Sequence, residues 1–152
     1  MNVEVEVSIK ASKPAIWAAI SDIEHATKII RGIEKIEIVN KPANGLIGLR
    51  WRETRILFGK PATAEKWITD AVENEYYQTR AESDGFIFLS TTRIEEQEGQ
   101  QGAMRLISVH DSQPQTWMTK LMVIPMRLFF KGVAKKALMQ DLIDIKTAVE
   151  RA

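Results

Sequence analysis

The side chains best suited to chemistry lie in two neighbouring stretches, residues 49–57 and 62–72, that both have the character of β-strands. Side chains alternate between the two faces of a strand, so the odd-numbered positions of each stretch are expected to share one inward face. If the stretches pair around Gly59, that face carries two indoles, two carboxylates and one guanidinium: Trp51, Glu53, Arg55, Glu65 and Trp67. On this register the two tryptophans face each other, the two glutamates face each other, and Arg55 lies diagonally from Glu65.

Two carboxylates that face one another in a poorly hydrated space cannot both ionise cheaply unless a cation lies between them. Arg55 is the nearby candidate for that cation. Glu53 or Glu65 could then act as an acid or base, while Arg55 holds a carbonyl or carboxylate of a ligand. The alternative is a buried ion network that fixes the register of the sheet, because such networks also perturb pKa values. We therefore predict ligand contacts for these residues and assign no catalytic residue.

His110 is the histidine expected to face the interior, because it shares strand parity with Leu106 and Ser108, whereas His25 falls in a short helical segment. His110 has no acid or nucleophile beside it in the sequence, which favours a satisfied strand-end histidine at the far end of a cavity over a catalytic base. Two distant histidines do not have metal-ligand spacing, so no metal site is expected.

Further residues that could line a cavity come from strand parity and from helical spacing. Methionines recur every four residues between 118 and 126, and their thioethers adapt to varied ligands, although such a stripe can equally fill a core. The additional candidates for ligand contact are Tyr77, Phe88, Met122, Met126 and Phe130.

These side chains must be positioned by the surrounding elements, which begin with one strand and two short helices. Val3 to Ile9 alternates apolar and polar residues, which predicts a strand with one buried face. Ser12 is expected to cap a short helix and Pro14 to stand near its first position, and a second short helix is expected to end at Gly32. Six strands separated by turn residues follow between about residues 36 and 111.

A long helix is predicted from the C-terminal third of the chain. Apolar residues recur at three-and-four spacing from Phe130 to Val149, whereas Lys131 and Asp144 fall on other faces. Pro125 predicts a kink or break near Ile124. Seven antiparallel strands that curl around this helix would form one α+β domain over residues 1–152, with a cavity between sheet and helix.

The composition limits the possible partners and compartments. Lys plus Arg number 21 and Asp plus Glu 20, so no nucleic-acid partner is implied. The chain contains no cysteine, no secretion signal and no apolar run of about 18 residues, which predicts a cytoplasmic protein without stable membrane insertion. It also lacks a glycine-rich phosphate loop, a dinucleotide fingerprint and a Gly-x-Ser-x-Gly elbow, so no cofactor is expected.

The order of the elements resembles the START-like superfamily, and more narrowly the SRPBCC group of polyketide cyclase/dehydrase-like and lipid-transport-like proteins. The resemblance covers the whole chain. It is carried by residues 8–17, by Gly48 to Arg55 with Gly59 and Lys60, and by residues 131–142. It implies a helix-grip fold with a hydrophobic ligand cavity, and it carries over no catalytic residue, because members with different activities share no single catalytic set.

Three functions follow from these observations. The first is binding of a small hydrophobic or amphipathic molecule, such as a lipid, an isoprenoid or an aromatic polyketide. The second is a cyclase or dehydratase in which the cavity carboxylates or His110 move protons. The third is an interaction module, such as a homodimer formed through a sheet edge or through the apolar segment 117–130.

Overall fold

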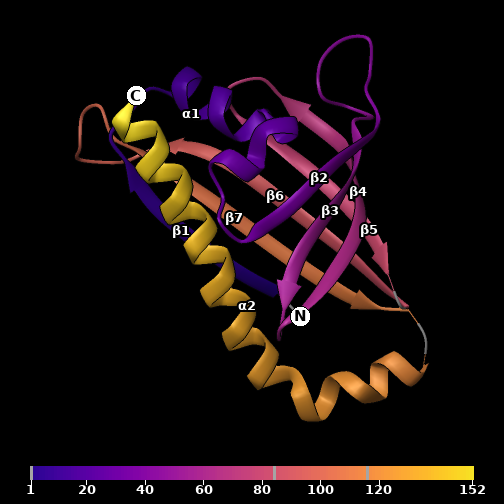
Figure 1. Cartoon of the computed structure of the whole chain (residues 1–152). Coiled ribbons are helices and arrows are strands. Elements are labelled where there is room, and N and C mark those ends of the chain that lie inside the picture. Colours follow the sequence, from indigo (N-terminus) through magenta and orange to yellow (C-terminus); the bar gives the residue numbers. More distant parts are fainter. Residues whose placement is uncertain (1, 84, 116) are drawn as a thin grey trace.

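The computed structural model describes residues 2–83, 85–115 and 117–152, with side chains described outside residues 117–130. Its elements in chain order are β1 (Asn2–Ile9), α1 (Lys13–Ser21), η1 (Ile23–Lys28), β2 (Ile33–Asn40), β3 (Arg50–Leu57), β4 (Lys60–Val72), β5 (Tyr76–Ser83), β6 (Phe86–Glu96), β7 (Met104–Pro114) and α2 (Trp117–Arg151). The antiparallel strands form one sheet in the order β1-β7-β6-β5-β4-β3-β2. The curved sheet faces α2, and α1 and η1 lie at the end where α2 finishes (Figure 1). The predicted α+β helix-grip architecture is confirmed.

The start of α1 follows from its local sequence. The Ser12 hydroxyl accepts a hydrogen bond from the Ala15 backbone N–H at 3.2 Å, and Pro14 stands in the first turn. A proline is tolerated there because its missing N–H has no partner within the helix in any case. The predicted cap is therefore confirmed, and it sets where the chain leaves β1 and begins to cover one end of the sheet.

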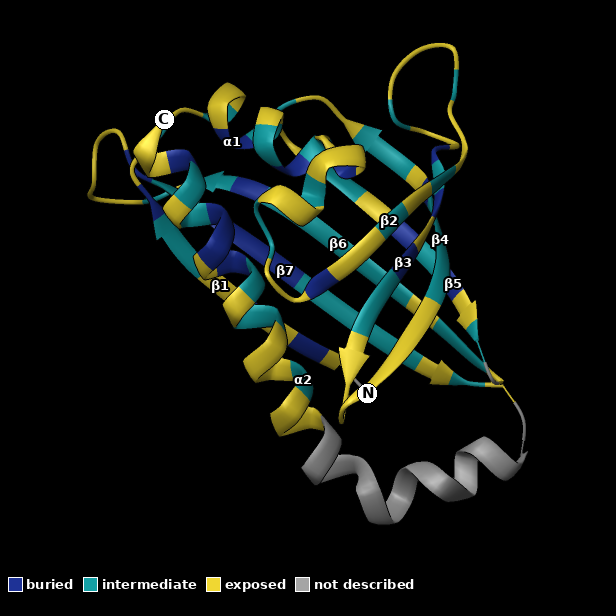
Figure 2. Ribbon diagram, in the orientation of Figure 1, coloured by how far each residue is buried: buried dark blue, intermediate teal, exposed yellow. Residues whose placement is uncertain are grey.

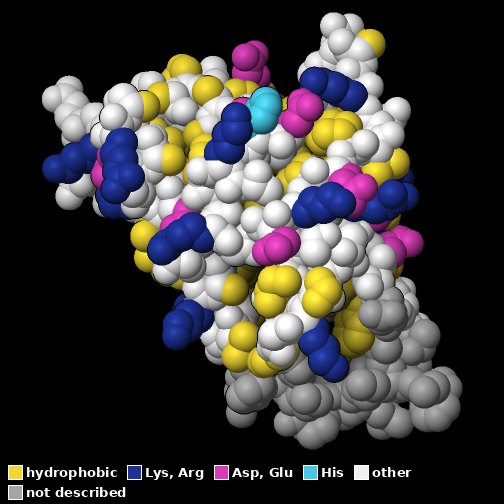
Figure 3. All heavy atoms as spheres, viewed as in Figure 1, with side chains coloured by type: hydrophobic (Ala, Val, Ile, Leu, Met, Phe, Trp, Pro, Cys, Tyr) yellow, Lys and Arg dark blue, Asp and Glu magenta, His cyan; other side chains and the backbone are white. Residues whose placement is uncertain are grey.

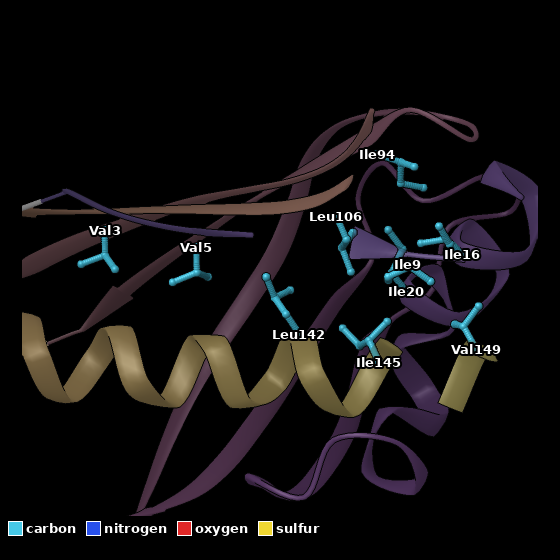
Figure 4. Close-up of a cluster of buried hydrophobic side chains, with 10 residues drawn as sticks. All are labelled: Val3, Val5, Ile9, Ile16, Ile20, Ile94, Leu106, Leu142, Ile145 and Val149. Atoms are coloured by element: carbon cyan, nitrogen blue, oxygen red, sulfur yellow. The ribbon is translucent and has the colours of Figure 1, made fainter. Parts of the chain in front are cut away.

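The main core lies between the C-terminal part of α2 and the strands that it crosses. Leu142, Ile145 and Val149 are buried against residues of β1, α1 and β7 (Figure 4). The apolar stripe predicted from residue 130 is buried only at its C-terminal end, at these three residues. Val133, nearer the start of the stripe, is 40% exposed. Most of the described side chains of α2 before Leu138, those of residues 131–137, are accordingly exposed (Figure 2). The predicted kink near Ile124 lies outside the residues whose structure is described in full.

Asp144 differs from its prediction, which placed it on an outer face of the helix. Its carboxylate is 7% exposed and accepts hydrogen bonds from the Arg31 backbone N–H at 3.0 Å and from the Arg31 guanidinium at 3.1 and 3.2 Å. The Gln140 amide donates a further bond at 2.9 Å. Asp144 therefore fastens the segment between η1 and β2 to α2, because a buried carboxylate is stable only when donors surround it.

The β3–β4 hairpin has a register one residue away from the predicted one. Leu57 pairs with Lys60, so Phe58 and Gly59 form a two-residue turn in which both residues have positive φ, at 52° and 79°. Trp51 consequently lies opposite Lys66 instead of Trp67. A shift of one residue turns every side chain of a strand to the other face, so Lys66 faces inward and Glu65 and Trp67 face outward.

Within the part of the chain that was described, no helix is long and apolar enough to cross a membrane.

Candidate functional site

A cavity of about 110 Å³ lies between the sheet and the three helical elements. Its helical side is mainly aliphatic, with Ile20, Ile23, Leu138 and Leu142, to which Ile30 is added by the segment between η1 and β2 and one charged group by Asp141 of α2. Its other wall is the inner face of β3 to β7, where most of the lining side chains are polar or charged. The cavity therefore offers an apolar surface on one side and hydrogen-bonding groups on the other.

The centre of the polar wall is the carboxylate of Glu53, which is 7% exposed. One of its oxygens accepts hydrogen bonds from Arg55 Nε at 2.8 Å and from Lys66 Nζ at 3.0 Å, and the other lies 3.4 Å from Trp51 Nε1. Burial alone would raise the pKa of Glu53, but the charges of Lys66 and Arg55 and their hydrogen bonds outweigh it and lower the pKa to about 2. Glu53 is therefore an anion at all physiological pH values.

Asp141 of α2 completes the ionic network from the opposite side of the cavity. Its two carboxylate oxygens accept hydrogen bonds from the two terminal nitrogens of Arg55 at 3.2 and 2.8 Å, a bidentate arrangement that joins β3 to α2. Burial raises the pKa of Asp141, and the bonds to Arg55 oppose this only in part. Burial would lower the pKa of Arg55, but its bonds to Asp141 and Glu53 hold that pKa above the ordinary value.

Gly32 allows this network to form so close to the backbone. A methyl group at this position would lie 3.0 Å from a terminal nitrogen of Arg55 and 3.5 Å from an Asp141 oxygen. The short approach leaves no room for a larger residue without movement of the ion pair.

Hydroxyl groups fill the rest of the polar wall in pairs. Thr79 and Ser90 hydrogen-bond to one another across β5 and β6, and Thr92 lies opposite Tyr77 on the same two strands. Burial, with the nearby Glu53 and Asp141 charges, raises the pKa of Tyr77 to about 12, so its phenol stays protonated. The Tyr77 ring meets Trp17 of α1 edge to face, with centroids 6.2 Å apart.

His110 contributes an uncharged imidazole to the same wall. Its Nε2 lies 2.8 Å from the Ser108 hydroxyl, and both residues border the cavity. Burial is the main reason that the pKa of His110 falls to about 4, and the positive charges of Lys66 and Arg55 add to this effect. The imidazole is therefore neutral at pH 7.

The structure brings five of the predicted residues to the cavity lining: Trp51, Glu53, Arg55, Tyr77 and His110. The inward orientation predicted for Glu65 and Trp67 is wrong, for the reason of register given above. Glu65 instead pairs with Arg50 at 2.8 Å and Arg52 at 3.4 Å on the outer face. The Arg50 guanidinium lies 4.2 Å from the centre of the Trp67 ring.

Phe88 is 42% exposed, stacks on Phe86 and is not among the residues that line the cavity. The side chains of Met122, Met126 and Phe130 lie outside the described residues.

Lys66 and Asp141 are the charged residues of the candidate site that strand parity and helical spacing do not identify. A hairpin centred on Gly59, with the odd-numbered residues inward, places Lys66 on the outer face. Asp141 directly precedes the buried Leu142 on the helix, which places it beside the core-facing stripe. Its proximity to Arg55 depends on packing between residues 86 positions apart in the chain, which sequence spacing does not reveal.

Comparisons with known proteins identify the fold. No family model matches the chain, and no curated protein matches it. A START superfamily protein from Mycobacterium smegmatis is similar over 99% of this chain and 97% of that one, with a TM-score of 0.76 and 18% identity. An aromatase/cyclase from Streptomyces gives a TM-score of 0.81 at 16% identity, over 99% of this chain and 94% of that one. A Thalictrum norcoclaurine synthase, a point mutant in complex with a transition-state analogue, gives 0.74 at 15% identity, over 99% and 94%.

These similarities establish that the chain has the START-like, helix-grip fold. At such low identity they carry the fold alone, so function has to be argued from the site.

Proposed function

We propose that this chain binds a small hydrophobic or amphipathic molecule in the cavity between the sheet and α2. Lipids, isoprenoids and aromatic polyketides are the candidate ligands. In this proposal the aliphatic helical wall supplies affinity, and the Arg55, Glu53 and Lys66 network orients the polar part of the ligand.

The observation that carries the proposal is the cavity itself, about 110 Å³ in volume, between one aliphatic and one polar wall. Protein interiors are ordinarily packed to the density of organic crystals, and one water needs only about 10–15 Å³. The cavity is smaller than the roughly 300–1,000 Å³ of ligand pockets in general, which favours a small guest. The START-like fold of the aromatase/cyclase and norcoclaurine synthase neighbours supports a ligand-binding role by analogy.

Extraction of the purified protein followed by mass spectrometry is the direct test. We expect a small organic molecule to be recovered in stoichiometric amount from the wild type. Leu138→Trp fills the cavity from α2 and should abolish recovery, whereas Ile143→Trp changes a 41% exposed position on the same helix and should not. Equal recovery from both variants, or none from any of the three proteins, would contradict the proposal.

A second candidate function is proton transfer to a bound carbonyl compound. The observation that favours it is that Asp141, with its raised pKa, borders the same cavity as a neutral His110. A neutral imidazole can accept a proton from a bound carbonyl compound, and a carboxylate with a raised pKa is a stronger base than an ordinary one. Glu53 is less suited to this role, because three donors already hold its carboxylate in the ionised form.

The test is turnover of a linear polyketone by the wild type, Asp141→Asn and His110→Ala. Loss of turnover in both variants, with ligand binding retained, would support proton transfer. Turnover that is unchanged in either variant would exclude that residue from the chemistry, and no turnover by the wild type would leave binding as the function.

A further inference from the structure

The two carboxylates that border the cavity, Glu53 of β3 and Asp141 of α2, are both already paired with cations of the chain. Glu53 receives hydrogen bonds from Arg55, Lys66 and Trp51, and Asp141 receives two from Arg55. A ligand ammonium group would have to displace Arg55 or Lys66 from these partners and would be repelled by both. Like charges brought together in a poorly hydrated site disfavour binding.

Hydrogen-bond donors, in contrast, are in excess on this wall. The Lys66 ammonium group carries three N–H donors, and among the described residues only Glu53 accepts from it. In a pair of hydroxyl groups such as Thr79 and Ser90, one hydroxyl hydrogen forms the bond between them, and the other hydroxyl hydrogen remains available to a ligand. The pair of Ser108 and neutral His110 also leaves one donor, whichever imidazole nitrogen carries the proton.

The free donors lie close to one another because the strands are in register. Lys66 pairs with Ala81, and Ile68, two residues further along β4, pairs with Thr79. Lys66 is therefore diagonal to Thr79, which in turn lies opposite Ser90, and Ser90 lies opposite His110. The positive charge of Lys66 is close enough to contribute to the low pKa of His110. One polar edge of a ligand can reach both the ammonium group and the hydroxyls.

We propose that the ligand is a small organic acid whose carboxylate is bound by Lys66 beside the hydroxyl pairs, with its apolar body against the aliphatic wall. This inference rests on the proposed binding function and names the class of ligand for that site. A carboxylate has two oxygens and about four lone-pair sites, which matches an excess of donors, and its charge complements the ammonium group. The cavity volume of about 110 Å³ favours an acid of about one ring in size.

The experiment compares three probes that share one ring and differ in charge: benzoate, benzyl alcohol and benzylamine. Each is titrated into the nitrogen-15-labelled full chain at pH 7, and the affinity is taken from saturable shifts of amides around the cavity. We expect benzoate to bind at least about tenfold more tightly than benzyl alcohol, since one charge-assisted hydrogen bond is worth about that factor. Benzylamine should bind most weakly.

Lys66→Met should remove the preference for benzoate over benzyl alcohol, because methionine keeps the apolar length and loses the charge. Lys60→Met is the matched control, since it removes the same charge from the exposed start of the same strand. We expect this control to keep the wild-type preference. If Lys66→Met fails to fold, the ratio of the benzoate affinity to the benzyl alcohol affinity in the wild type still tests the inference.

The outcomes separate this inference from the binding function on which it rests. Benzyl alcohol or benzylamine binding as tightly as benzoate would overturn the acid assignment and leave a ligand cavity in place. A preference that persists in a folded Lys66→Met variant would overturn the role of Lys66. Absence of saturable binding by all three probes would overturn the inference, while the extraction experiment would decide separately whether the cavity holds any ligand.

Discussion

The two faces of the β3–β4 hairpin carry similar residues in different surroundings. On the inner face Glu53 contacts Arg55 and Lys66, and its carboxylate is almost entirely buried. On the outer face Glu65 contacts Arg50 and Arg52, with about a third of its side chain exposed. The number and length of the ion pairs are comparable, so the difference between the faces is hydration. Buried pairs cannot lose one partner without a large cost, whereas exposed pairs contribute little.

The surface that is visible in Figure 3 resembles the outer face of the hairpin in this respect. Lys and Arg side chains are interspersed there with Asp and Glu among the described residues (Figure 3). Ion pairs between neighbouring charges that remain in water contribute little to stability. In the cavity, by contrast, the sheet and α2 largely remove the charges of Glu53, Arg55 and Asp141 from solvent.

The largest difference between the two faces is expected when one glutamate on each face is neutralised. Glu53→Gln leaves Arg55 and Lys66 beside a neutral group in a buried site and should lower the free energy of unfolding by about 3–5 kcal/mol. Glu65→Gln should cost less than about 1 kcal/mol. Urea unfolding followed by circular dichroism measures both values. Equal costs would show that burial does not distinguish the two faces.

The buried position of Glu53 also makes stability depend on pH, because its pKa is about 2 in the folded chain against an ordinary value of 4.5. A carboxylate with a lowered folded-state pKa stabilises the protein fully above pH 4.5, and this stabilisation is lost as the pH falls to about 2. The difference corresponds to about 3 kcal/mol. Unfolding free energies of the wild type and of Glu53→Gln, measured from pH 7 to 2, should therefore converge. Parallel curves would contradict the assigned pKa.

A pair of glycine substitutions tests how tightly the inner network is packed. Gly32→Ala places a methyl group 3.0 Å from Arg55 and should cost about 1–2 kcal/mol by displacing the pair with Asp141. Gly132→Ala meets nothing within 4 Å and should stabilise the helix by about 1 kcal/mol. Thermal unfolding shows whether each substitution lowers or raises the melting temperature. Stabilisation by Gly32→Ala would show that the network is looser than described.

The smallest expected effect belongs to the outer face. Arg50→Met removes the cation over Trp67 and one partner of Glu65, and should cost about 0.5–1 kcal/mol. High salt should reduce this cost, because exposed charges are screened. Chemical denaturation by urea in low and high salt measures it. A cost that equals that of Glu53→Gln would remove the distinction between the faces.

Much of the cavity could be predicted from strand parity, but only where a single strand was considered. Odd-numbered residues of β3 were expected to face inward, and Trp51, Glu53 and Arg55 do so. The predicted register between β3 and β4 is wrong by one residue, because the turn that joins the strands sets their register. Phe58 is not a residue type that signals a positive φ, so the two-residue turn with Gly59 was not recognised. This single error in the turn places Glu65 and Trp67 on the predicted inner face, where the structure has Lys66.

Sequence patterns alone predict the order of the strands and helices, the cap at Ser12 and an apolar stripe from Phe130 to Val149, because these features depend on hydrogen bonds and periodicity within one element. The stripe is buried only in its later part, at Leu142, Ile145 and Val149. The tertiary structure decided which charges lie together. Asp141 meets Arg55, and Asp144 meets Arg31, through contacts between α2 and residues more than 80 positions earlier. Such contacts depend on how the helix is rotated and placed over the sheet. That arrangement minimises the free energy of the whole core and is not encoded in the spacing of any single segment.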